Sequence, residues 1–133
     1  MAAKALSAIM ERIRGPRAGA EGEELACRHL VAQGFAILAR NFRCRSGEVD
    51  VVARDGPVTV FVEVKHRRGR AYGAGYDSVT FGKRRRIVRA ARLYASARGL
   101  SESPIRFDVV SIDEVDGRQR LRHDRGAFDV DGG

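Results

Sequence analysis

The chain has 133 residues, of which 44% are hydrophobic, and it carries a formal net charge of +8 at pH 7. This length suits one domain with one core, and the hydrophobic content excludes a disordered protein. No stretch approaches the roughly 18 apolar residues of a membrane span, and the N-terminus lacks the continuous apolar run of a secretory signal. We therefore expect a cytoplasmic protein with no membrane partner.

The positive charge favours an anionic partner, with nucleic acid ahead of a membrane surface, although solubility alone is an alternative explanation. Of the 25 basic residues only Lys4, Lys65 and Lys83 are lysines. Where arginine is so strongly preferred, a remaining lysine indicates a position that needs a compact ammonium group. Cys27 and Cys44 form no CxxC pair, and the three histidines do not complete a zinc pattern.

Hydrophobic periodicity and the glycine and proline breaks predict the elements in chain order. They are a flexible or short-helical tail over 1–18, a helix over 19–33, strands over 35–42, 48–53 and 58–66, a basic glycine-rich loop over 67–80, a helix from 81 or 83 to 98, and a strand over 104–113. The last part of the chain adds at most a short strand before a frayed end at 129–133. The order α-β-β-β-α-β predicts one α/β domain over 19–128, with a mixed sheet flanked by helices.

The turn "RDGP" makes the strands over 48–53 and 58–66 antiparallel neighbours. Regular alternation places Glu48, Asp50 and Val52 on one face of the first strand, and Val49 and Val51 on the other.

On the second strand Glu63 and Lys65 share a face, so Asp50 can meet them at one edge of the sheet. The two carboxylates, with the carbonyl of Val64 between Glu63 and Lys65, are the oxygen ligands that Mg²⁺ prefers. Lys65 could then orient a water or stabilise the charge of a pentacovalent phosphate. A solvated strand face with a cross-strand ion pair is the alternative.

The segments "GEVDVVA" and "VFVEVKHR" resemble the Asp…Glu-x-Lys core of the PD-(D/E)XK nuclease superfamily, which has the restriction-endonuclease-like fold. Together with "GEELACRHLVAQGF", "RNFRCRSGEVD", "RFDVV" and "LRHDRGAF", they resemble the small bacterial YraN family over residues 19 to 128. Val49 stands where the superfamily usually has a proline before the aspartate.

The resemblance implies that Asp50 and Glu63 hold Mg²⁺, or Mn²⁺ in its place, and that Lys65 is the catalytic lysine. It also implies that Glu23 joins them, as a helix glutamate does in archaeal Holliday-junction resolvases. A favourable position near a helix start is the alternative role of Glu23. Whether Glu48 joins the metal or only flanks it stays open.

Basic residues without any acid occupy the predicted helix from 81 or 83 to 98. We expect Lys83, Arg84, Arg85, Arg86 and Arg89, together with Arg67 at the end of the Glu-x-Lys strand, to bind nucleic-acid phosphates. A solvated helix face is the ordinary alternative for such a run. Asp108 is expected to pair with an arginine as structural support, outside the metal site, and His66 to lie on the opposite face from Lys65.

The leading hypothesis is therefore a metal-dependent endonuclease that acts on DNA rather than RNA. Phosphate contacts carry little sequence information, which favours a structure-specific or non-specific substrate. A homodimer would suit cleavage of branched DNA. Two alternatives stay open: a non-catalytic nucleic-acid-binding module on the same scaffold, and a basic adaptor for an acidic protein partner.

Overall fold

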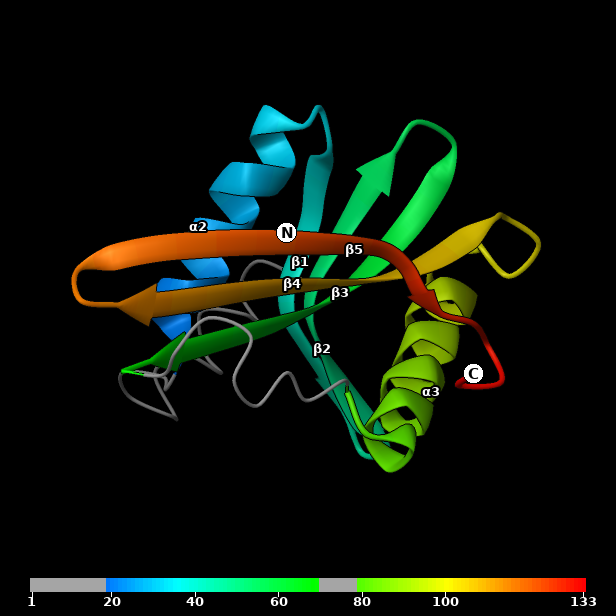
Figure 1. Ribbon diagram of the computed structural model, residues 1–133. Helices are drawn as coiled ribbons and strands as arrows, with labels where there is room; N and C mark the ends of the chain where they lie inside the picture. Colours follow the sequence, from blue (N-terminus) through cyan, green and yellow to red (C-terminus); the bar gives the residue numbers. More distant parts are fainter. Residues whose placement is uncertain (1–18, 70–78) are drawn as a thin grey trace.

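The computed structural model describes residues 19–69 and 79–133 (Figure 1). The expected tail over 1–18 and most of the basic loop lie outside the described residues. The elements in chain order are α2 (Ala20–Ala32), β1 (Ala36–Cys44), β2 (Gly47–Asp55), β3 (Val58–Arg68), α3 (Phe81–Ala97), β4 (Ile105–Val115) and β5 (Arg118–Phe128). The predicted helices and the first four strands are confirmed, with ends that differ by a few residues.

The five strands form one mixed sheet in the order β1-β2-β3-β4-β5. Only β3 and β4 are parallel, and α3 forms the crossover between them, as a parallel connection requires. All other neighbours are antiparallel. Figure 1 shows the strong twist of this sheet between α2 and α3.

Strand β5 is longer than the short strand that we expected, because it pairs with β4 from Val115↔Arg118 to Phe107↔Phe128. Its sequence, RQRLRHDRGAF, has almost no apolar alternation. The strand lies at the edge of the sheet, where backbone pairing with β4 holds it and most side chains stay exposed. Residues 129–133 form a turn in which Asp131 N donates to Asp129 Oδ1 at 2.9 Å. Fraying of this end stays a prediction.

Both faces of the sheet are buried under a helix. The α3 face includes Val52, Phe61 and Phe107, which pack with Tyr94 of the helix. The α2 face is a second cluster that includes Ala26 and Leu30 of the helix and the strand residues Val60, Val62, Val110 and Ile112. Because β3 alternates between two apolar layers, it reads as a nearly continuous run of valines around Phe61.

The close fit of α2 depends on Gly22. A Cβ atom at this position would lie 2.7 Å from Cβ of His66, so only glycine lets the helix approach β3. His66 also has Nε2 3.3 Å from Glu114 Oε2, and its side chain is largely buried. His66 thus faces α2, away from Lys65, and its contacts are structural, as predicted.

Asp108 of β4 is fully buried and is the centre of a polar cluster. Arg106 donates to it through Nε at 2.8 Å and Nη2 at 3.1 Å, and the backbone N of Gly126 donates at 3.0 Å. His123 Nε2 lies 2.8 Å from the carboxylate, and its Nδ1 lies 3.1 Å from Nε2 of His29. The cluster therefore ties β4 to β5 and α2, which confirms the expected pairing of Asp108 with an arginine.

The regular alternation predicted for β2 is wrong at one point. Val49 and Val52 lie on the α3 face, whereas Val51 and Ala53 lie on the α2 face, so Val49 and Val51 do not share a side. The break falls at Asp50, opposite Asn41, whose φ of 55° is left-handed. A local kink of this kind shifts the side-chain alternation by one residue.

Candidate metal centre and nucleic-acid interface

The candidate site lies where β2 separates from β3. Their backbone pairing extends only to Val51↔Val62. Beyond that pair the side chain of Asp50 replaces the backbone as the hydrogen-bond partner of β3, because its Oδ2 accepts a hydrogen bond from the backbone N of Val64 at 2.8 Å. The kink in β2 thus turns an acidic side chain toward the strand that carries Glu63.

Glu63 is 6% exposed and lies on the α3 face, two residues after Phe61. Burial raises its pKa to about 9, and a hydrogen bond with Asp50 and the negative charge of Asp50 act in the same direction. Lys83 opposes them, because its Nζ lies 3.3 Å from Glu63 Oε1. The two acids therefore form one carboxylate pair that retains a proton at neutral pH, beside an ammonium group.

Lys65 follows Glu63 on the same face of β3. Strands β3 and β4 pair without a break from Thr59↔Ile105 to Arg68↔Glu114, so strict alternation holds over this part of the strand. Lys65 is half-buried, pairs with Ser111, and precedes the half-buried Arg67 by two residues.

Val64 contributes its backbone N to Asp50, while its side chain packs on the α2 face. The role of its carbonyl as a metal ligand stays a prediction.

Glu23 is buried in α2, at helical spacing from Ala26, Cys27 and Leu30, and so faces the sheet. Its charge acts on Arg40 of β1. In the two described ranges no group of three or more His, Cys, Asp or Glu side chains is close enough to hold a metal ion. The structure thus brings Asp50 and Glu63 together without Glu23, whose part in a metal site stays a prediction.

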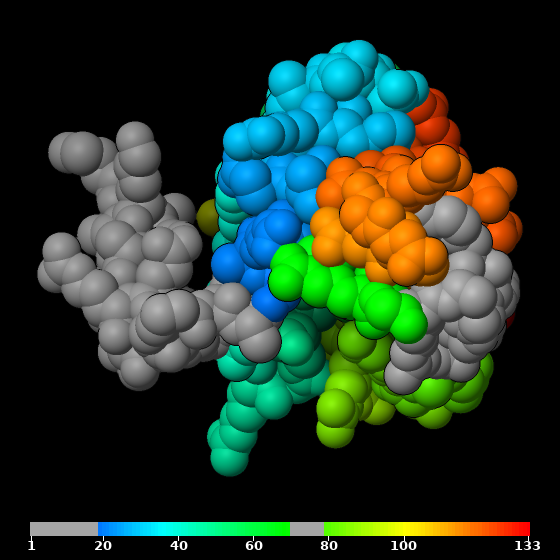
Figure 2. All heavy atoms as spheres, turned by 60° about the vertical axis from the view of Figure 1, so that its left-hand side comes forward, coloured from blue at the N-terminus to red at the C-terminus, as the bar shows by residue number. Residues whose placement is uncertain are grey.

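A basic cleft of about 880 Å³ is connected to the carboxylate pair by Lys83, which lines the cleft and contacts Glu63. It lies between the β1–β2 turn and the first three turns of α3; Figure 2 shows these two segments projecting side by side with open space between them. It is lined by Arg43, Cys44, Arg45, Ser46, Gly47, Glu48, Thr80, Gly82, Lys83, Arg86, Ile87 and Arg89. Five cations thus surround one acid.

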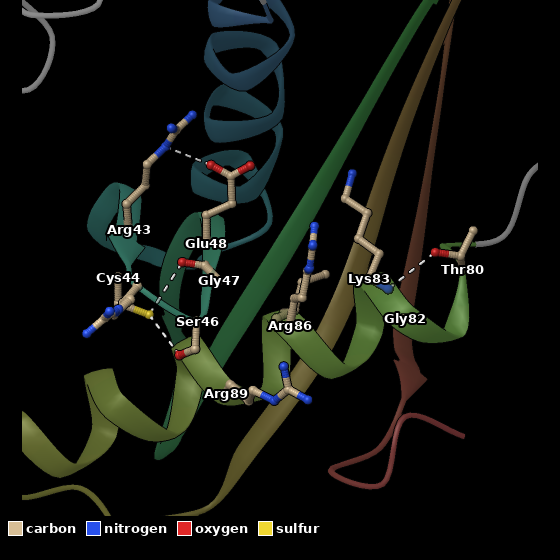
Figure 3. Close-up of a pocket in the computed structure, with 12 residues that line it drawn as sticks. Arg43, Cys44, Ser46, Gly47, Glu48, Thr80, Gly82, Lys83, Arg86 and Arg89 are labelled. Atoms are coloured by element: carbon tan, nitrogen blue, oxygen red, sulfur yellow. Dashed lines mark hydrogen bonds and ion pairs between the residues drawn. The ribbon is translucent and has the colours of Figure 1, made fainter.

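The turn and the helix approach closely at Gly47. A Cβ atom there would lie 2.1 Å from the carbonyl oxygen of Arg86, so the turn needs a glycine to dock on α3. Next to the turn, Arg43 of β1 has its Nε 2.7 Å from Oε2 of Glu48 on β2 (Figure 3). Glu48 therefore pairs with an arginine at the wall of the cleft.

Three of the five cations expected on α3 line the cleft: Lys83, Arg86 and Arg89. Arg84 instead donates to the carbonyls of Val79 and Gly132, at 2.7 and 3.0 Å. Arg85 lies over the ring of Phe81.

The sequence analysis missed Arg43 and Arg45. The spacing of two arginines around the Ser46-Gly47 turn is a signal, but it points to a cleft only once the turn is known to face α3.

These elements define a single-domain α/β protein with a restriction-endonuclease-like fold: a five-stranded mixed sheet, a helix on each face, and a carboxylate pair where two strands part. Uncharacterised protein family UPF0102 matches residues 22–112. The chain belongs to this family, the YraN family.

Relatives across bacteria agree with this assignment. UPF0102 protein STH1475 of Symbiobacterium thermophilum is 50% identical, with 84% of this chain and 96% of that protein covered. UPF0102 protein Franean1_1156 of Parafrankia sp. is 51% identical over the same shares. UPF0102 protein PSPA7_4996 of Pseudomonas paraeruginosa is 42% identical, with 92% of this chain and all of that protein covered. Their names state no activity.

No helix of the described ranges is both long enough and apolar enough to cross a membrane.

Proposed function

We propose that this protein is a metal-dependent endonuclease that hydrolyses phosphodiester bonds in DNA. The observation that carries the proposal is the pairing of the buried Glu63 with the half-buried Asp50, beside Lys83, which with four other cations also lines a cleft. The acids suit a divalent cation, and the cleft suits the phosphates on either side of the bond that is cut.

The donor chemistry of the site fits Mg²⁺, with Mn²⁺ as a substitute. Both acids offer oxygen, and a positively charged group already lies 3.3 Å from Glu63 Oε1. Asp50, Glu63 and the carbonyl of Val64 would hold the ion, with Glu23 as a further candidate. Bound there, the ion would supply a Lewis acid that lowers the pKa of a water and neutralises phosphate charge.

The residues of the chain have separate roles in this proposal. Asp50 is oriented by its hydrogen bond from Val64 N, so its free oxygen has a defined direction. Lys65 orients the attacking water or stabilises the negative charge that builds up on phosphate, as a preorganised cation does.

Arg43, Arg45, Arg86 and Arg89 hold the backbone next to the scissile bond. Contacts of this kind do not read base edges, which favours a structure-specific or non-specific substrate.

Labelled branched, single-stranded and double-stranded DNA, with RNA of matched sequence, should be incubated with the protein and Mg²⁺ or Mn²⁺. We expect the protein to cleave DNA, and we expect a chelator to abolish the cleavage. The Lys65→Ala variant should cleave at a rate reduced by about 100-fold or more. Arg118→Gln, at the exposed start of β5, is the control and keeps the rate. Undiminished cleavage by Lys65→Ala would overturn the mechanism.

The same substrates distinguish the two alternative functions. Salt-dependent binding without cleavage, unaffected by Asp50→Asn, would identify a non-catalytic binding module. Loss of all DNA and RNA binding at low salt would favour an adaptor for an acidic protein partner.

A further inference from the structure

Lys83 links the two halves of the candidate site. Its Nζ lies 3.3 Å from Glu63 Oε1, an atom of a side chain that is only 7% exposed, while its own side chain is 49% exposed. The same side chain lines the basic cleft, where it stands beside Arg86 (Figure 3). One ammonium group thus borders both the carboxylates and the proposed phosphate track.

The backbone of Lys83 is held at the start of α3, whereas its side chain is half-exposed. The residue lies in the first turn of α3, where its N donates to Thr80 Oγ1 at 3.2 Å. From this anchor a flexible four-carbon stem carries a compact charge. A small rotation of the stem can therefore exchange a carboxylate partner for an anion in the cleft without any movement of the helix.

We propose that Lys83 is the resident counter-cation of the Asp50–Glu63 pair in the metal-free protein, and that a divalent ion displaces it toward the cleft. There the ammonium binds a phosphate of the substrate. This inference rests on the proposed function, because it assumes that the carboxylate pair binds a metal. It adds that metal and lysine compete for the same carboxylates.

The direction of the competition follows from charge. In the metal-free protein the ammonium group of Lys83 lies 3.3 Å from Glu63 Oε1, close enough for a strong attraction to the carboxylate pair. A divalent ion neutralises the pair and removes that attraction. Lys83 thus stabilises the metal-free state more than the metal-bound state, so its removal strengthens metal binding whichever acid holds the proton.

Calorimetric titration with Mn²⁺, without nucleic acid, measures this competition in a readout that needs no activity. Three chains should be compared: wild type, Lys83→Met, and Arg85→Met as a control that removes one charge from the same helix. We expect Lys83→Met to bind Mn²⁺ about tenfold more tightly than Arg85→Met. Lys83→Gln should behave as Lys83→Met does, and thermal melting verifies that each variant is folded.

Two results would overturn the inference, and they are distinguishable. Equal Mn²⁺ affinity in the Lys83 variants and in Arg85→Met would overturn the displacement and leave the proposed metal site intact. Absence of Mn²⁺ binding in all the folded chains would overturn the proposed metal site, and the inference with it.

The second part of the inference is that the displaced ammonium group of Lys83 binds a phosphate of the substrate in the cleft. In the Lys65→Ala background, which suppresses cleavage, Lys83→Met should weaken binding of a labelled DNA oligonucleotide more with Mn²⁺ than with a chelator. The reason is that Lys83 reaches the phosphates only after the metal has displaced it. An equal loss of affinity under both conditions would contradict this transfer.

Discussion

The carboxylates of Asp50 and Glu63 lie in different environments although they touch. Glu63 is buried under α3, whereas Asp50 is half-buried and receives a hydrogen bond from Val64 N. The pKa of Glu63 is raised to about 9, chiefly by burial. Burial and a neighbouring carboxylate both raise the pKa of an acid, and acids perturbed in this way are common at functional sites.

The raised pKa of Glu63 predicts that the free energy of unfolding of the metal-free protein depends on pH. Between the ordinary pKa of 4.5 and the folded value of about 9, the folded state holds a proton that the unfolded state has lost. The free energy of unfolding therefore falls as pH rises through this window, by up to about 1.4 kcal/mol per pH unit. Glu63→Gln should remove this slope.

Chemical denaturation from pH 5.5 to 8.5, in the presence of a chelator, measures the effect. Glu48→Gln is the matched control, because Glu48 is an exposed acid on the neighbouring strand and should leave the slope unchanged. If wild type and Glu63→Gln follow parallel lines, Glu63 does not hold the proton.

At the scale of elements, two devices position the site. The kink in β2 turns Asp50 toward β3, and Gly47 lets the β1–β2 turn dock on α3. The N-terminus of α3 then presents Lys83, with Thr80 as its cap. The basic cleft is therefore a product of how one hairpin and one helix pack.

On the other side of the sheet, the Asp108 cluster holds β4, β5 and α2 together, and it predicts a large loss of stability in Asp108→Asn. Burial alone would raise the pKa of Asp108, but the hydrogen bonds from His123, Arg106 and Gly126 lower it below its ordinary value of 3.8. The stabilisation is thus present above that value and is lost as pH falls through the folded pKa.

We expect Asp108→Asn to reduce the free energy of unfolding at neutral pH by about 3 kcal/mol, because it removes the buried charge that Arg106 and His123 contact and leaves Arg106 with Asp55 as its acidic partner. Asp124→Asn is the control: it disrupts an exposed pair with Arg122 on β5 and should cost less than about 1 kcal/mol. Urea denaturation of the three chains measures both values. Equal stabilities would mean that the cluster is not a structural support.

At the scale of the whole molecule, the basic residues behind the net charge of +8 are unevenly distributed. Several arginines of α2, β4 and β5 pair with acids, as in Arg28–Glu24, Arg106–Asp108 and Arg122–Asp124. The cleft instead gathers five cations around Glu48. Because a polyanion releases counterions where cations gather, the cleft should dominate any salt-dependent binding.

This distribution predicts different effects of charge-matched variants on DNA binding. Replacing Arg86 and Arg89 with glutamine should reduce the steepness of the plot of log affinity against log salt concentration by about two for duplex DNA. Replacing Arg118 and Arg122 removes the same charge from β5 and should change the steepness little. Fluorescence anisotropy at several salt concentrations measures both, and equal slopes would place the interface elsewhere.

Local patterns were sufficient to predict most elements of this protein. The spacing of apolar residues predicted both helices, the "RDGP" turn predicted the antiparallel β2–β3 pair, and strand alternation placed Glu63 and Lys65 on one face. These features depend on residues within a few positions of one another, so the sequence by itself determined them. The family blocks added the restriction-endonuclease-like scaffold and Glu23 as a further candidate acid.

Only the tertiary structure decided how distant residues meet. It separated Val49 from Val51 by a kink at Asp50, and it extended β5 along β4 despite the weak apolar pattern of β5. It also joined Arg43 and Arg45 to the cleft and placed Lys83 against Glu63. Contacts of this kind depend on the angle and depth at which whole elements pack, which periodicity along one segment does not encode.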